Sequence, residues 1–340
     1  MRKTLRLTLC CAAAILVAAC HHTGDTPSSS TPQPDYSAVQ LPPFSADSAY
    51  RYVADQLQFG FRTPGSRGHA ECAAYIARQM ARWCDTIVTQ DFTTTLWDGS
   101  EAHGRNIIAS INPTADKRIL LAAHWDSRLW ADHDPDASQH RLPVMGANDG
   151  ASGTAMLMEL ARAMQALPPS VGVDFIFFDL EDQGTPEWAD SYADNTWCKG
   201  AQHWANYPHR PFYHALYGVL FDMVGTASPR FTKEEVSRHY ATAITDKLWR
   251  VAAAIGEGQT FVSEASPAIL DDHLYINQVA GIPTVDIVQN DATGSFFPHW
   301  HTRTDDLSTI DVKTLQTVAR VVLTMIYADY PPAAPKNSLS

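Results

Sequence analysis

The sequence predicts an α/β fold, a single-domain three-layer sandwich in which helices cover both faces of a mostly parallel central sheet. Short runs of consecutive apolar residues recur along the chain, as expected of strands that are buried on both faces. Segments with apolar residues at helical spacing lie between these runs, and this alternation is typical of α/β domains. With 340 residues, of which 45% are hydrophobic, the chain can bury the core that such a domain needs.

The expected elements follow one another along one domain at 41–330, in which no internal repeat is visible. The segments with helical periodicity are 45–58, 67–84, 153–167 and 311–330. The runs expected to form strands are 86–92, 105–111, 118–123, 173–178, 219–224 and 285–288. Before the domain, 20–40 is rich in Ser, Thr and Pro and is interpreted as a flexible tether, and the tail at 331–340 is expected to be disordered.

The first 19 residues have the pattern of an export signal. Basic residues near the N-terminus precede an apolar stretch at 5–17, which is too short to span a bilayer as a mature helix. The segment ends in Val-Ala-Ala-Cys at 17–20 and resembles a bacterial lipoprotein signal. This resemblance implies removal of 1–19, a lipid on Cys20, and a chain anchored to a bacterial membrane and facing the periplasm. An ordinary cleaved signal is the alternative, and export is expected in both cases.

Charge and cysteine content exclude two classes of protein. The 25 basic residues are outnumbered by 37 acidic ones, for a net charge of −12, so a nucleic-acid partner is not expected. Six cysteines in 340 residues are too few for a fold held together by disulfides. Cys72 and Cys84 share an expected helix and are too far apart along it to pair, whereas Cys198 could pair with either or stay reduced. We expect a monomer.

Polar side chains follow several of the expected strands, at the points where the strands end. His124 and Asp126 come after the third expected strand and point to the same side of an extended chain. Other polar residues also lie at the ends of expected strands, at the starts of expected helices or in loops. They are Asp149, Glu181, Asp182, Asp222, Asp271, Asp272 and His301. The carboxyl ends of parallel strands meet at one edge of a sheet, where α/β proteins place their sites. Crowded carboxylates repel one another unless a cation compensates, and zinc takes such nitrogen and oxygen ligands.

These residues resemble the successive metal and catalytic elements of the zinc-dependent M28 peptidase-like superfamily, and more closely those of its glutaminyl-peptide cyclotransferases. The motifs that carry the resemblance are His-Trp-Asp at 124–126, Ala-Asn-Asp-Gly at 147–150, Phe-Phe-Asp-Leu-Glu-Asp at 177–182, Asp-Asp-His at 271–273 and Trp-His at 300–301. The resemblance runs from about residue 41 to about residue 330. It implies the zinc aminopeptidase-like form of the α/β sandwich.

Carried over residue by residue, the resemblance also implies roles. It implies a single zinc ion held by Asp149, Asp182 and His301, where Asp182 stands at a position that the family usually fills with Glu. Glu181 matches the catalytic acid and base, Asp222 and Asp271 match an acidic hydrogen-bond network around it, and Trp188 and Trp300 match walls of the substrate pocket. His124, Asp126 and Asp272 are assigned to a second metal site or to support of the first. The disulfide that the animal enzymes carry near the first motif is not expected here.

The implied reaction closes an N-terminal glutamine of a peptide or protein to pyroglutamate and releases ammonia, with zinc polarising the side-chain amide carbonyl and Glu181 moving the proton. The principal alternative is a two-zinc aminopeptidase of the same superfamily, in which Glu181 activates a water molecule. Its two metal sites would be shared among His124, Asp149, Asp182, Asp222 and His301. A non-catalytic lipoprotein that binds a ligand on the same scaffold is a third hypothesis.

Overall fold

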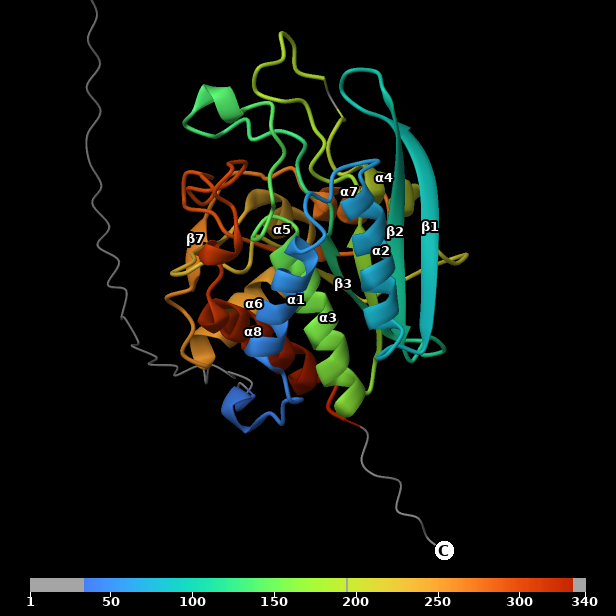
Figure 1. The fold of residues 1–340 in the computed structure, drawn as a ribbon. Coiled ribbons are helices and arrows are strands. Elements are labelled where there is room, and N and C mark those ends of the chain that lie inside the picture. The colour runs from blue at the N-terminus through green and yellow to red at the C-terminus, as the bar shows by residue number, and fades with distance from the viewer. Residues whose placement is uncertain (1–33, 194, 333–340) are drawn as a thin grey trace, which may run out of the picture. The chain divides into compact units, whose positions relative to one another are not determined.

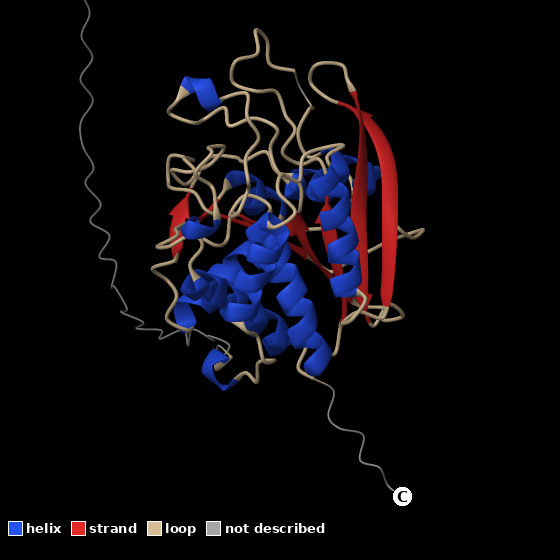
Figure 2. Cartoon of the chain, viewed as in Figure 1, coloured by secondary structure: helices blue, strands red, loops and turns tan. Residues whose placement is uncertain are grey.

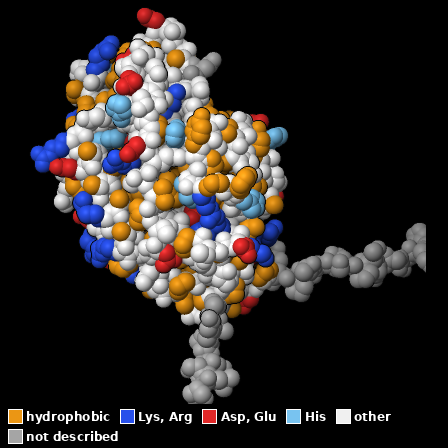
Figure 3. Space-filling view, turned by 90° about the vertical axis from the view of Figure 1, so that its right-hand side faces the viewer, with side chains coloured by type: hydrophobic (Ala, Val, Ile, Leu, Met, Phe, Trp, Pro, Cys, Tyr) orange, Lys and Arg blue, Asp and Glu red, His pale blue; other side chains and the backbone are white. Residues whose placement is uncertain are grey.

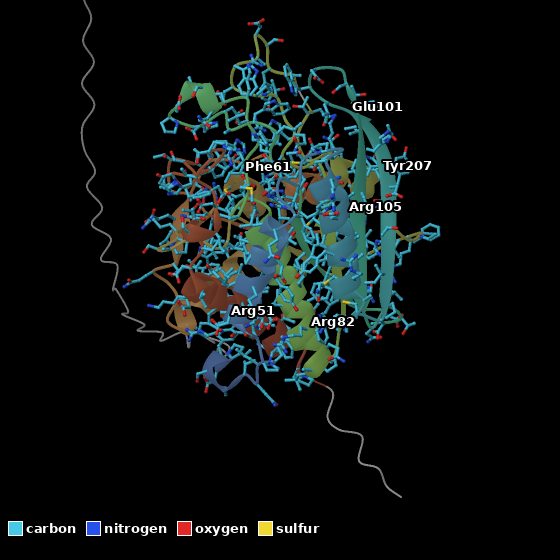
Figure 4. The ribbon with its side chains drawn as sticks, in the orientation of Figure 1. Arg51, Phe61, Arg82, Glu101, Arg105 and Tyr207 are labelled. Carbon is cyan, nitrogen blue, oxygen red and sulfur yellow. The ribbon has the colours of Figure 1, made fainter. Side chains whose placement is uncertain are left out.

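A six-stranded sheet forms the middle layer of the fold in the computed structural model, which describes residues 34–193 and 195–332 (Figures 1 and 2). In spatial order its strands are β1 (Thr86–Thr95), β2 (Glu101–Ile111), β4 (Gly172–Phe178), β3 (Arg118–His124), β5 (Gly218–Asp222) and β8 (Thr284–Val288). The first two form a long hairpin at the side of the sheet, and Figure 4 labels Glu101 and Arg105 along β2. The hairpin pairs antiparallel to β4, whereas β4, β3, β5 and β8 run parallel.

Helices cover both faces of this sheet. One face packs against α1 (Ala46–Leu57), α2 (Arg67–Met80), α3 (Ala151–Ala166), α6 (Thr242–Ala254) and α8 (Val312–Asp329). The other face packs against α4 (Lys199–Asn206) and α7 (Asp272–Gln278), and α5 (Glu235–Tyr240) lies beside β8 and α7. The parallel strands therefore end at a common edge, and the loops at 125–150, 179–198 and 289–311 gather there, at the top of Figure 1.

The burial of β3 shows why the strand runs are apolar without interruption. Ile119, Leu121 and Ala123 belong to the larger hydrophobic core, together with residues of α1, α3 and α8. Leu120 and Ala122, on the alternate positions, belong to the smaller core beneath α4 and α7. Because successive side chains of a strand point to opposite faces, a strand covered on both sides needs apolar residues at every position. The predicted three-layer α/β sandwich is confirmed.

One charged residue within a buried strand has a partner for its charge. Asp174 lies in β4, where its side chain is almost fully buried, and Arg118 at the start of β3 donates to both of its oxygens at 2.5 and 2.6 Å. Ser110 and Tyr213 donate to the same carboxylate at 2.5 and 2.7 Å. Arg118 and these hydrogen bonds lower the pKa of Asp174, although burial alone would raise it. The pair compensates for a charge that would otherwise destabilise the core.

The structure corrects the expected helix at 67–84, which ends at Met80. Its last turn tightens, with the amide of Trp83 donating to the carbonyl of Met80 at 3.0 Å, and the chain then enters β1 at Thr86. Cys84 therefore lies outside the helix. Within the described residues Cys72, Cys84 and Cys198 are all free thiols.

Other parts of the fold were not expected from the sequence. A small parallel sheet pairs β6 (Phe231–Lys233) with β7 (Phe261–Ala265), and single turns of 3-10 helix occur at η1 (Tyr36–Ala38), η2 (Ala137–Gln139) and η3 (Leu307–Thr309). Folded structure begins before the expected domain start at residue 41, because the side chain of Tyr36 is buried in the larger core. The expected signal at 1–19, the lipid-attachment residue Cys20 and most of the tether at 20–40 and of the tail at 331–340 lie outside the described residues.

Within the described ranges, none of the helices is both long and apolar enough to cross a bilayer. Figure 3 views the side of the molecule on which β1 lies in Figure 1. Acidic, basic and hydrophobic side chains are interspersed on this face, without a large area of one charge.

Candidate active site

Polar side chains from distant parts of the sequence meet where the parallel strands end. They are His124 (end of β3), Asp149 (before α3), Glu181 and Asp182 (after β4), Asp222 (end of β5), Asp271 (N-cap of α7) and His301 (loop before α8). The relative exposure of Glu181, Asp149, Asp182 and His301 is at most 8%. The structure thus brings together the residues predicted to bind the metal and to catalyse the reaction.

The turn that carries Asp149 is fixed by two buried charged side chains. Arg62 donates to two backbone carbonyls of the turn, both at 2.7 Å, and Asp305 accepts the backbone N–H of Asp149 at 3.0 Å. Gly150 ends the turn with a φ of 91°, and a Cβ atom there would lie 2.5 Å from the backbone oxygen of Asp126. A side chain at this position would therefore displace the turn from the site.

Asp126 aligns the loop that carries the predicted acid and base. Its two carboxylate oxygens accept the backbone N–H groups of Glu181 and Asp182, at 3.1 and 3.2 Å, and Gln183 donates to it at 2.9 Å. The loop also contains Leu180 at a φ of 55°, a conformation that non-glycine residues rarely adopt. Because its oxygens are engaged in this way, Asp126 supports the site rather than binding a metal.

Four sets of side chains in the described residues are compact enough to bind a cation, and two of them share Asp149. In the first set, Nε2 of His301 lies 2.9 Å from Oδ1 of Asp182 and 3.5 Å from Oδ2 of Asp149. In the second set, Nε2 of His124 lies 3.0 Å from Oδ1 of Asp149 and 3.2 Å from Oδ1 of Asp222. The two sets correspond to the single predicted zinc site and to the additional site of the two-zinc alternative.

The charges around the first set suit a metal ion. Burial and the nearby Arg128 guanidinium lower the pKa of His301 well below its usual value, so its ring is neutral, as a ligand must be. Burial and the Asp149 carboxylate raise the pKa of Asp182 well above its usual value. A divalent cation between these oxygens would relieve their repulsion, and two carboxylates with one neutral imidazole form a donor set that zinc accepts. The residues present therefore fit a zinc ion.

Glu181 lies in an environment that favours its protonated form. Burial is the largest cause that raises its pKa well above the usual value, and the Asp271, Asp182 and Asp272 carboxylates add to it. Asp222 behaves similarly: burial raises its pKa to about 7, although a hydrogen bond with His124 acts in the opposite direction. Groups that change protonation near neutral pH are those that can serve as general acids and bases.

The site opens into a cavity of about 530 Å³. Glu181, Asp271 and the first set of metal-binding side chains lie on its floor, and its walls include Trp197, Phe296 and Trp300. The rings of Trp197 and Trp300 both stack on His301, with centroids 5.9 and 3.8 Å away. The cavity therefore combines a polar floor with flat aromatic walls, and it contains Trp300 as predicted.

The pocket role predicted for Trp188 has no support from the cavity lining and stays a prediction. Its neighbours Glu187 and Ala189 line the cavity, but Trp188 is absent from the described residues that do so. Its ring instead packs edge-on against Trp130, with centroids 6.0 Å apart, and stacks with His140. The same loop, between β4 and α4, contributes Trp197 to the cavity lining, and the sequence pattern did not predict this residue.

An ion pair behind the metal-binding side chains was also missed. Arg128 donates to both oxygens of Asp132, at 2.7 and 2.5 Å, and both side chains are about 1% exposed. Oδ1 of Asp132 lies 3.6 Å from Nδ1 of His301, and Arg128 donates to the backbone oxygen of Asp182 at 2.9 Å. The pair thus contacts two metal-binding residues from behind. No sequence pattern marked it, because burial of a charged loop residue cannot be read from its neighbours.

Asp272 does not belong to either metal-binding set. Both of its carboxylate oxygens are buried and make no hydrogen bond within the described residues. Asp271 caps α7 by accepting the backbone N–H of Asp272 at 2.5 Å. Behind them His273 and Asp286 continue the buried polar cluster, with Nδ1 of His273 3.7 Å from Oδ2 of Asp286.

The chain is similar to a known protein family and to solved structures. Residues 106–326 match peptidase family M28. The structure is similar to that of a glutaminyl cyclase from Bacteroides thetaiotaomicron bound to N-acetylhistamine, with 43% identity and a TM-score of 0.83 over 85% of this chain and 99% of that one. It is similar to the same extent to a Zn-dependent exopeptidase from Parabacteroides distasonis, with 44% identity and a TM-score of 0.83 over 85% and 99% of the two chains.

A more distant relative points to the first of these two activities. The glutaminyl-peptide cyclotransferase of Gloydius blomhoffii is 27% identical over 292 residues, which cover 77% of this chain and 75% of that protein.

We predict that Asp132→Asn weakens zinc binding by about 10- to 100-fold, because the Asp132 carboxylate lies 3.6 Å from Nδ1 of His301 and its negative charge favours a cation bound by that ring. Competition with a chromogenic chelator measures this affinity without reference to activity. Asp136→Asn is the matched control, since it removes a charge from an exposed residue of the same loop and should leave zinc affinity unchanged. Equal affinities of the wild type and Asp132→Asn would show that the ion pair does not position the ligand.

Proposed function

The chain belongs to peptidase family M28, and from this membership and the geometry of its site we propose that it is a glutaminyl-peptide cyclotransferase. The substrates are peptides or proteins with an N-terminal glutamine, which the enzyme converts to pyroglutamate with release of ammonia. The observation that carries the proposal is the composition of the cavity. Glu181, whose pKa is raised, lines it together with Asp149, Asp182 and His301 and with the aromatic residues Trp197 and Trp300.

The roles of the cavity residues follow from their positions. The glutaminyl side chain is short and ends in a flat amide, so the faces of Trp197 and Trp300 suit it and exclude water around it. Asp149, Asp182 and His301 would hold a single zinc ion, which when bound supplies Lewis-acid polarisation of the amide carbonyl.

Glu181 moves the proton that the reaction requires. The α-amine forms a bond to the carbon of its own side-chain amide and must lose a proton, and the departing nitrogen must gain one to leave as ammonia. One carboxyl group within reach of both nitrogens can accept the first proton and supply the second, which typically accelerates such a reaction by about 10²- to 10⁴-fold. Asp271 lines the same cavity and adds to the raised pKa of Glu181, so it supports this role.

A two-zinc aminopeptidase is the second candidate. It is favoured by one observation, the compact set of His124, Asp149 and Asp222 that could bind another cation. In that case Glu181 would activate a water molecule for attack on the first peptide bond, and the peptide would lose its N-terminal residue.

The N-terminal sequence supports a further part of the proposal. Its basic start, apolar stretch and Val-Ala-Ala-Cys ending favour export, lipid attachment at Cys20 and a periplasmic enzyme held at a bacterial membrane. Newly exported peptides that begin with glutamine are then within its reach.

Mass spectrometry of a peptide that begins with Gln-Ala tests the activity. The purified, zinc-loaded protein should remove one ammonia from the peptide and leave the chain length unchanged. Glu181→Gln should reduce the rate by at least about 10²-fold while zinc content stays the same, because the amide cannot transfer the proton. A shortened peptide would identify an aminopeptidase, and an unchanged rate in Glu181→Gln would show that another group moves the proton.

A matched pair of tryptophan variants tests the pocket walls. We expect Trp197→Leu to raise KM for the glutaminyl peptide by about 2- to 10-fold through loss of an aromatic contact, and Trp188→Leu to leave KM unchanged. Steady-state kinetics of ammonia release measures both. A larger increase in KM for Trp188→Leu than for Trp197→Leu would contradict the assignment of Trp197 to the cavity wall.

A further inference from the structure

A thiol and two carboxyl groups meet next to the predicted acid and base. Glu181, Cys198 and Asp271 each offer one potential ligand atom, and these three atoms all lie within 4.8 Å of one another. The thiol of Cys198 donates a hydrogen bond to Oε1 of Glu181 over 3.2 Å, and the backbone N–H of Cys198 donates to the carbonyl oxygen of Glu181 at 2.8 Å. All three residues are buried, and Cys198 is fully inaccessible to solvent.

One oxygen of this group lacks a partner. Oδ2 of Asp271 is buried and makes no hydrogen bond among the described residues, whereas Oδ1 accepts the backbone N–H of Asp272. A buried carboxylate oxygen without a donor is costly, and a cation is one way to compensate for it.

The cavity gives a cation access to the two carboxyl groups of this set, with the thiol buried directly behind Glu181, and it attracts the cation. Glu181 and Asp271 both line the cavity, so their side chains can be reached from its mouth. Its acidic lining residues are Asp149, Glu181, Asp182, Glu187, Asp222 and Asp271, and none of the described residues that line it is Lys or Arg. A second divalent cation is therefore drawn to the cavity even when the first metal-binding set is filled.

We propose that Cys198, Glu181 and Asp271 form a separate, inhibitory binding site for a thiophilic divalent cation, such as Cd²⁺ or excess Zn²⁺. Sulfur selects soft and borderline cations, and the two carboxylate oxygens complete a three-ligand set that zinc and cadmium accept. On binding, Glu181 releases its proton to the solvent in the cavity, and the thiol passes its own proton along its hydrogen bond to Oε1 of Glu181 and from there to the same solvent. A bond then forms between sulfur and the metal, and no electrons are transferred.

The site differs in chemistry from both metal-binding sets described above. Those sets contain only histidine and aspartate, so a metal bound there gives no sulfur signal. A cation at the cysteine site takes the carboxylate of Glu181 and thereby blocks the proton transfer. Only this inhibitory effect rests on the proposed cyclotransferase function, because binding itself does not depend on the reaction.

Titration of the zinc-loaded protein with CdCl₂ tests the proposal through the ultraviolet charge-transfer band of a cadmium–thiolate bond. The wild type should gain a band that Cys198→Ser lacks, and the matched control Cys84→Ser should retain it. The remaining cysteines contribute equally to the wild type and to Cys198→Ser, so the difference between the two proteins reports Cys198 alone. Bands of equal size in these two proteins would overturn the proposal.

A second variant keeps the thiol and tests the carboxylate. Asp271→Asn should weaken cadmium binding at this site by about tenfold or more, and unchanged binding would exclude Asp271 from the site and overturn the three-ligand assignment. Cadmium should also inhibit ammonia release by the wild type at the concentrations that produce the band. The cadmium band and the reaction product are independent results. If the band forms as described but the protein shortens the peptide instead of releasing ammonia, the proposed metal site is supported and the proposed cyclotransferase function is contradicted.

Discussion

The concentration of buried carboxyl groups at one edge of the sheet is the constraint on which the site depends. Burial raises the pKa of Glu181, Asp182, Asp222 and Asp271, and neighbouring carboxylates add to this effect at the first three of them. They cannot all be ionised unless positive charge is brought in. A cation held by Asp182 together with Asp149 and His301 would supply that charge, and a proton on Glu181 would remove part of the repulsion. Metal binding and proton transfer are therefore two consequences of one electrostatic arrangement.

The fold holds these groups in place despite their repulsion. Parallel strands deliver the side chains to one edge, and buried groups such as Asp126 and Arg62 fix the loops by accepting from or donating to their backbone. Leu180 and His301 adopt positive φ values of 55° and 53°, which the surrounding hydrogen bonds and packing must enforce. The positions of the functional side chains are thus determined by their supporting neighbours as much as by the strands themselves.

Most of the fold and of the polar floor of the cavity could be predicted from the sequence. Strand ends are visible as the points where apolar runs stop, so His124, Asp126, Glu181, Asp182 and Asp222 were candidates by position alone. The motif at 300–301 added His301, and the structure brings it together with Asp149 and Asp182. The aromatic wall of the cavity could not be predicted, because it depends on the path of a loop. Trp188 and Trp197 lie on one connection between β4 and α4, and only the folded backbone decides which ring faces the cavity. The Arg128–Asp132 pair was missed for the same reason, because its burial arises from packing between distant segments.

If the proposed function is right, one zinc ion, held by Asp149, Asp182 and His301, is sufficient for ammonia release from an N-terminal glutaminyl peptide. Stepwise addition of zinc to the metal-free protein, with activity and bound metal followed together, tests it most directly. We expect activity to rise in proportion to bound zinc and to reach its maximum at one ion per chain. Activity that appears only when a second ion is bound would contradict the claim and would assign a catalytic metal to His124 and Asp222 as well.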